Sequence, residues 1–149
     1  MIGIPWLLAF SLRADGWYLR SDIIWQKDNP MPESVKDRPT RCYEHIFLLT
    51  KSKQYYYDPA LIPTMRNRRD VWLINTVPYK GGHFAAFPPK LAETCILASC
   101  PKGGIVLDPF FGSGTTGLAA KTLDRHYIGI ELNSEYCALA RARIGGKAP

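Results

Sequence analysis

A glycine-rich segment, DPFFGSGTTG at residues 108–117, holds the residues best suited to chemistry. Glycine lacks a Cβ atom, so Gly112 and Gly114 let a ligand approach the backbone. A helix that begins directly after them offers unpaired N–H groups at its N-terminus. Glu131 lies nineteen positions beyond Gly112, where a carboxylate can accept hydrogen bonds from ribose hydroxyls. The segment therefore predicts a ligand-binding loop.

Two classes of ligand fit this spacing. Gly112, Gly114 and Gly117 match the G-x-G-x-x-G pattern of dinucleotide-binding proteins, so NAD is one candidate. Hydrolysis of a nucleoside triphosphate is not expected, because no lysine follows the second glycine to hold the β- and γ-phosphates. The spacing alone does not exclude NAD.

Alternating strands and helices are predicted to position this loop. Prolines suited to a first helical turn begin a helix at residues 88–100, and a Pro-Lys-Gly-Gly segment ends it. The pattern then predicts a strand at 104–108, a helix at 114–123, a strand at 127–131 and a helix that Asn133 caps and that runs through Arg143. Such a βαβ unit implies a parallel sheet covered on both faces.

The first half of the chain is less regular. Its opening run, MIGIPWLLAFSL, is predicted as a helix that is apolar on nearly every side and too short to span a membrane. We expect either a partner against this helix or a longer protein of which the chain is the downstream part. Strands are predicted at WYLRSDIIWQ, EHIFLLTK and QYYYD, the last two as a hairpin, and residues 27–41 as a long exposed loop.

Length and composition favour one domain, since 149 residues with 46% hydrophobic content suffice for one core. The net charge of +6 permits a polyanionic partner such as nucleic acid. A basic patch at Arg66, Arg68 and Arg69 either contacts phosphates or stays solvated. The four cysteines show no Cys-x-x-Cys pair, so no metal site is expected and a reducing cytoplasm fits best.

Residues 108–116, DPFFGSGTT, resemble the S-adenosylmethionine (SAM) binding motif of DNA methyltransferases that modify adenine N6 or cytosine N4. YIGIELNSEYCALARARI resembles the segment that follows in this family, and HFAAFPPKLAE resembles its other SAM-contacting segment. The upstream half is similar to the middle of the same subgroup. The resemblance implies an α/β, Rossmann-like SAM-dependent methyltransferase fold, a parallel sheet with helices on both faces plus an antiparallel hairpin, incomplete at the N-terminus.

The resemblance implies SAM as cofactor, DNA as partner and no metal. The residues that it assigns to the cofactor are His83, Phe84, Phe87, Pro88, Asp108, Pro109, Phe110, Gly112, Ser113, Gly114, Thr115, Thr116, Glu131 and Leu132. The candidates for contact with DNA or the target base are Trp25, Lys27, Asn29, Arg38 and Arg41, together with the basic patch at Arg66, Arg68 and Arg69. Trp25 either contacts the base or only shapes the loop that follows it.

The catalytic Asp/Asn/Ser-Pro-Pro-Tyr/Phe/Trp tetrapeptide of this family does not occur in the sequence. In that motif a side-chain oxygen and a backbone carbonyl accept hydrogen bonds from the target amino group, and the aromatic ring stacks on the flipped base. Neither Phe87-Pro88-Pro89-Lys90 nor Asp108-Pro109-Phe110 fits the motif. We therefore assign no catalytic residue and expect the isolated chain to be inactive or to depend on another polypeptide.

These observations predict a single, partial DNA methyltransferase domain, with a target-side part at 1–82 and a SAM-binding part at 83–149. We expect a truncated, cytoplasmic protein of bacterial or phage origin, related to restriction–modification enzymes, with no membrane contact. We expect a homodimer, or a complementary chain that supplies the missing motif. Two alternatives stay open, a non-catalytic DNA-binding or regulatory partner of a complete methyltransferase and an NAD-binding oxidoreductase domain. Adenine and cytosine are equally permitted as targets.

Overall fold

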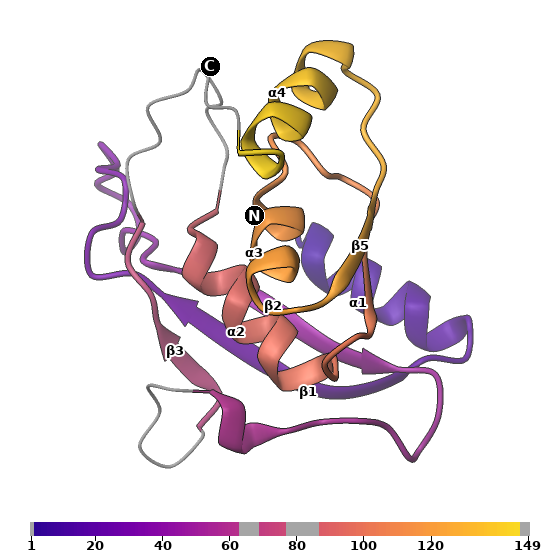
Figure 1. Cartoon of the computed structure of the whole chain (residues 1–149). Coiled ribbons are helices and arrows are strands. Elements are labelled where there is room, and N and C mark those ends of the chain that lie inside the picture. Colours follow the sequence, from indigo (N-terminus) through magenta and orange to yellow (C-terminus); the bar gives the residue numbers. More distant parts are fainter. Residues whose placement is uncertain (1, 63–68, 77–86, 147–149) are drawn as a thin grey trace. The chain divides into compact units, whose positions relative to one another are not determined.

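The computed structural model describes residues 2–62, 69–76 and 87–146 (Figure 1). The chain divides into two compact units, one of residues 1–55 and 64–75 and the other of residues 56–63 and 76–149. We call them the first and the second unit. Each unit contains its own sheet. Among the residues that the structure describes, no helix is long and apolar enough to cross a membrane.

The first unit is built on the strand order β2-β1-β3. The central strand β1 (Tyr18–Gln26) runs antiparallel to β2 (Tyr43–Thr50) and parallel to β3 (Val71–Leu73). The predicted first strand, exposed loop and second strand are thereby confirmed. The predicted strand at QYYYD is wrong, because β2 pairs along its whole length with β1, across the long loop.

Helix α1 (Ile4–Ala14) forms where the sequence predicts it, and its apolar side chains are mostly exposed. Ala9 is its one buried residue. Trp6 contacts β2, with its ring centre 5.2 Å from that of His45 and 5.0 Å from that of Phe47. Ile4, Leu7 and Leu8 remain more than half exposed, so within this chain the helix is not covered on every side.

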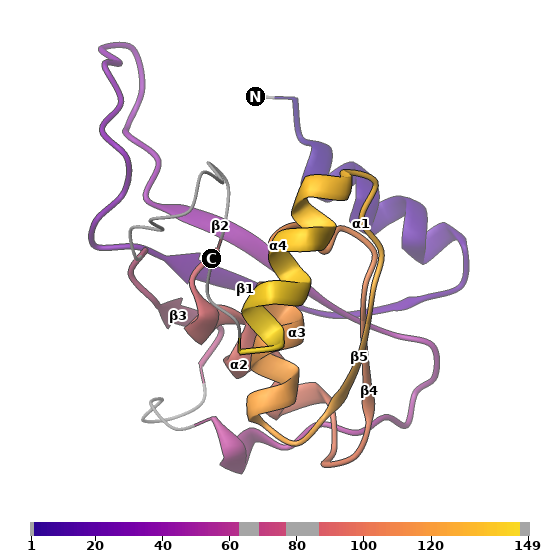
Figure 2. The same cartoon turned by 45° about the horizontal axis from the view of Figure 1, so that its top comes forward.

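The second unit contains the predicted βαβ unit. Strand β4 (Ile105–Asp108) pairs in parallel with β5 (His126–Gly129), and α3 (Thr115–Thr122) connects them (Figure 2). Helix α2 (Pro89–Ser99) precedes β4, and α4 (Ser134–Ile144) follows β5. The predicted cap of α4 is also confirmed, since the Asn133 side chain accepts a hydrogen bond from the Glu135 N–H at 2.8 Å.

Helices cover one face of the β4–β5 pair. A small core joins α2 to α3 through Ala92, Ile96, Ala119 and Ala120, and Val106 of β4 packs against it. Side chains alternate between the two faces of a strand, so the neighbours of Val106 point the other way. That second face carries four branched apolar residues whose side chains are 51–64% exposed. The sequence predicts helices on both faces of the sheet, and within the described residues helices cover only one face. The four residues are Ile105, Leu107, Ile128 and Ile130.

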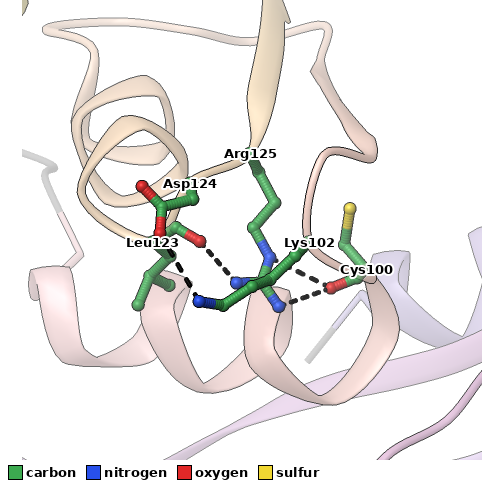
Figure 3. Close-up of polar contacts among 5 residues, drawn as sticks. All are labelled: Cys100, Lys102, Leu123, Asp124 and Arg125. Atoms are coloured by element: carbon green, nitrogen blue, oxygen red, sulfur yellow. Dashed lines mark hydrogen bonds and ion pairs between the residues drawn. The ribbon is translucent and has the colours of Figure 1, made fainter.

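Arg125 holds the C-terminal ends of α2 and α3 together (Figure 3). Its Nε and Nη2 donate to the Cys100 carbonyl oxygen at 3.1 and 2.9 Å, and its Nη1 donates to the Leu123 carbonyl oxygen. Cys100 and Leu123 are the C-cap residues of α2 and α3. A buried cation is favourable here because both helix ends carry partial negative charge.

The replacement Arg125→Met is expected to lower the free energy of unfolding by about 2–3 kcal/mol, because it leaves buried carbonyl oxygens without donors. Urea denaturation followed by circular dichroism measures this loss. The control is Lys102→Met, which removes only an exposed ion pair to Asp124 at 3.6 Å and should change stability by about 0.5 kcal/mol or less. Equal effects of the two replacements would contradict the role of Arg125.

Candidate cofactor-binding site

The glycine loop lies against the segment that leaves β5, because backbone pairing continues past the ends of the strands. The Ile130 N–H donates to the Asp108 carbonyl oxygen, and the Phe111 N–H donates to the Ile130 carbonyl oxygen, both at 2.9 Å. The carboxyl ends of two parallel strands meet at one edge of a sheet, which is where α/β proteins bind ligands. The structure thus brings together the two sequence segments that were predicted to form the site.

Glu131 is held at this edge by two backbone amides. Its Oε2 accepts from the Gly112 N–H and its Oε1 accepts from the Asn133 N–H, both at 2.8 Å. These two bonds fix the orientation of the carboxylate. Glu131 is therefore positioned beside the glycine loop, as an acceptor for the hydroxyls of a ligand must be.

Asp108 shapes the start of the loop. Its Oδ1 accepts a hydrogen bond from the Phe110 N–H at 2.9 Å, an Asx-type turn that reverses the chain directly after β4. The loop then passes through Gly112 at φ 49° and Gly114 at φ 81°, and α3 begins at Thr115. The predicted strand, loop and helix are all present in this order.

The two adjacent phenylalanines of the loop lie in different environments. The Phe111 ring stacks on Tyr127, with centres 5.7 Å apart, and a Cβ atom on Gly117 would lie 2.5 Å from it. Phe110 is 89% exposed. Gly114 likewise leaves room for α4, since its Cβ would lie 2.9 Å from that of Ala140. Two glycines of the motif thus serve packing within the protein, which their spacing did not reveal.

The remaining cofactor candidates all belong to the second unit. Pro88 is buried and is the N-cap of α2, and Phe87 before it is exposed. Leu132 is 100% exposed directly after Glu131. His83 and Phe84 lie outside the described residues. The other four are Pro109, which is exposed, Thr116, which is half-buried, and Ser113 and Thr115, which are 3% and 6% exposed.

The site offers a fixed carboxylate next to exposed apolar side chains, which suits a ligand with hydroxyl groups and an apolar ring. No group of three or more His, Cys, Asp or Glu side chains that could hold a metal ion occurs in the ranges that the structure describes.

Desolvation by burial raises the pKa of Cys95 in α2 to about 11, so this thiol stays neutral at physiological pH.

The residues predicted to lie near DNA belong to the first unit. Trp25 is buried, and its Nε1 donates to the Ile74 carbonyl oxygen at 2.7 Å. Lys27 lies with its Nζ 4.2 Å from the centre of the Trp25 ring and forms an ion pair with Glu44. These contacts of Trp25 and Lys27 shape the start of the loop at 27–41.

The other DNA candidates are on the surface where the structure describes them. Asn29, Arg41 and Arg69 are exposed, and Arg38 is paired with Glu33 at 2.8 Å. Arg66 and Arg68 lie outside the described residues. The cofactor candidates and the DNA candidates thus fall in different units of the chain.

The sequence analysis missed Arg143. Its Nη1 donates to the hydroxyl oxygen of Thr115 at 3.1 Å and to the hydroxyl and carbonyl oxygens of Ser113 at 3.4 Å. An arginine in the last turn of a helix is usually explained by the helix dipole or by solvation, so its position in the sequence carries no signal of this contact.

A glycine loop after one parallel strand and a fixed carboxylate after the next define a Rossmann-like, nucleoside-binding α/β fold. The sequence model of the DNA methylase family matches residues 4–142 of the chain. The chain belongs to this family of N6/N4 DNA methylases, and its fold is that of the SAM-dependent methyltransferases.

Similar proteins agree with this assignment. The chain is 60% identical to the Type II methyltransferase M.SmaI of Serratia marcescens over 97% of its length, and 58% identical to M.Cfr9I of Citrobacter freundii over 99%. It covers 52% and 51% of these two proteins, so it spans about half the length of the curated relatives it matches.

Two solved structures show the same fold. The M1.HpyAVI–SAM complex is 34% identical and has a TM-score of 0.79, with 95% of this chain and 68% of that chain covered. The cytosine-N4-specific PvuII DNA methyltransferase, 23% identical, has a TM-score of 0.84 over 96% of this chain and 57% of its own.

The two phenylalanines of the loop provide a matched test of its packing. Phe111→Ala is expected to lower the free energy of unfolding by about 2 kcal/mol, because it removes a half-buried ring between Gly117 and Tyr127. Phe110→Ala removes an exposed ring and should change stability by about 0.5 kcal/mol or less. Denaturant titration compares the two variants. A larger loss for Phe110→Ala would show that the loop is packed differently.

Proposed function

We propose that this chain is the SAM-binding portion of a site-specific DNA methyltransferase that methylates the exocyclic amino group of adenine (N6) or cytosine (N4). The observation that carries the proposal is the Glu131 carboxylate, held 2.8 Å from the Gly112 N–H at the ends of two parallel strands. The similarity to the Type II methyltransferases M.SmaI and M.Cfr9I and to the M1.HpyAVI–SAM complex supports it.

The residues present fit SAM. Glu131 would accept hydrogen bonds from the ribose hydroxyls, and the exposed side chains of Phe110 and Leu132 would cover the adenine ring. Asp108 and the loop up to Gly114 would hold the amino acid part of the cofactor. When bound, SAM supplies a methyl group on a positively charged sulfur. The protein's part is to fix this methyl in line with the acceptor nitrogen.

DNA would be held by the target-side part of the chain, residues 1–82. The net charge of +6 favours a polyanion, and several cationic residues of the first unit are exposed, Arg41 and Arg69 among them. Contacts of this kind position the duplex through its phosphates and carry no sequence information by themselves. Trp25 and Lys27 would set the path of the loop at 27–41, where Asn29 lies, toward the target base.

A complementary polypeptide that carries the missing catalytic motif would complete the enzyme. The sequence contains no Asp/Asn/Ser-Pro-Pro-Tyr/Phe/Trp tetrapeptide, and the chain spans about half the length of its curated relatives. The β4–β5 pair also exposes a face of four branched apolar side chains, and exposed patches of this kind mark interaction sites. The relatives come from bacteria, so we place this activity in the bacterial cytoplasm.

Calorimetric titration of the chain with SAM, and with NAD in parallel, tests the cofactor. We expect SAM to bind and NAD not to bind. Glu131→Ala and Asp108→Ala should each weaken SAM binding at least about tenfold, because they remove a ribose acceptor and the turn that shapes the loop. Asp124→Ala, an exposed carboxylate in the turn between α3 and β5, is the control. Binding of NAD in preference to SAM would support the oxidoreductase alternative.

A complementation experiment tests the partner. The chain is mixed with the part of M.SmaI that it does not match, and transfer of labelled methyl from SAM to DNA is measured. We expect transfer from the mixture and none from either half, and loss of transfer with Leu107→Glu, which places a charge on the apolar face. SAM binding by this variant is the control. Methyl transfer by the chain alone as a monomer would contradict the proposal.

A further inference from the structure

We propose that Arg143 is a positioning residue of the cofactor site, which holds the glycine loop in its ligand-ready conformation from the side of α4. The inference rests on the proposed SAM site and adds to it a residue from a different element. Its starting observation is that one guanidinium nitrogen, Nη1, donates to Thr115 Oγ1 at 3.1 Å and to Ser113 Oγ and O at 3.4 Å.

The two side chains that Arg143 contacts are buried, Ser113 at 3% exposure and Thr115 at 6%. A buried hydroxyl without a hydrogen-bond partner is costly, so the loop conformation that points both hydroxyls toward α4 is favoured only while Arg143 is there. The same conformation places the backbone of Gly114 between these residues, at the start of α3. Arg143 therefore acts on the loop through the two hydroxyls and the Ser113 carbonyl oxygen.

The loop needs the hydrogen bonds from Arg143 because its glycines allow the backbone several conformations. Gly112 and Gly114 both have positive φ, and glycine reaches this region and the ordinary one with similar ease. A loop that is disordered before binding loses conformational entropy when the ligand binds, which weakens the affinity. Hydrogen bonds from a helix side chain order the loop before the ligand binds and so reduce this loss of conformational entropy.

Two neighbouring contacts keep α4 in place for this role. Ala140 and Ile144 pack where Gly114 has no side chain, with distances of 2.9 and 3.1 Å from an added Cβ atom. Lys121 of α3 donates to the Ile144 carbonyl oxygen at 2.9 Å. Arg143 thus extends from a helix that is itself packed against α3. Its hydrogen bonds therefore hold the loop to a fixed part of the protein.

The test compares Arg143→Met with Arg141→Met, an exposed arginine of the same helix. Amide hydrogen exchange of the ligand-free chain is measured first. We expect exchange in residues 112–116 to become about tenfold faster in Arg143→Met, with α2 and β4 unchanged, and no change of the loop in Arg141→Met. Arg143→Lys should restore part of the protection, since lysine keeps the charge but not the planar fork.

SAM titration is the second readout. Arg143→Met is expected to weaken SAM binding about tenfold, and Thr115→Val, which removes one acceptor, to weaken it less. The effects of the two changes should not add in the double variant, because they break the same bond. If Arg143→Met does not fold, the rate of amide hydrogen exchange of residues 112–116 in Thr115→Val decides whether Arg143 positions the loop.

The two proposals fail in different ways. Unchanged exchange of residues 112–116 in Arg143→Met and in Thr115→Val would overturn the role of Arg143, whatever the affinity for SAM. A wild-type chain that does not bind SAM would overturn the proposed cofactor, while the exchange of the ligand-free loop would still decide whether Arg143 positions it.

Discussion

The bond between the Glu131 carboxylate and the Gly112 amide is the contact on which the geometry of the candidate cofactor site depends. It joins the loop after β4 to the segment after β5, two parts of the chain that lie nineteen residues apart. The bond is possible only because the two strands are parallel and paired in register up to Asp108 and Gly129. Helix α3 connects the two strands, as in other parallel βαβ units.

Around this contact, residues of the loop divide between two tasks. Phe111 and Gly114 face the protein, where they pack against Tyr127 and α4, and Arg143 engages the hydroxyls on either side of Gly114. Phe110 and Leu132 face outward and are almost fully exposed. A loop that is anchored through one set of side chains can present its backbone and its other side chains to a ligand without first becoming ordered, which is how preorganised sites gain affinity.

The second unit holds the candidate cofactor site and a small core. Its helices cover one face of the β4–β5 pair through α2 and α3, and Arg125 ties the ends of these helices together. The other face carries Leu107 and Ile128 in exposed positions. A parallel sheet normally has both faces covered, and among the described residues of this unit the second face has no helix over it.

Local spacing and backbone chemistry were sufficient to predict the order of elements in the second unit, the glycine loop, the acid after the next strand and the cap at Asn133. The segment QYYYD was misassigned, since strand pairing is decided by partners distant in sequence, and β2 pairs with β1. The sequence pattern did not predict that Trp25 is buried, that Gly114 makes room for α4 or that Arg143 contacts the loop. Each of these facts concerns which surface a side chain meets, and that depends on packing between elements rather than on the pattern within one.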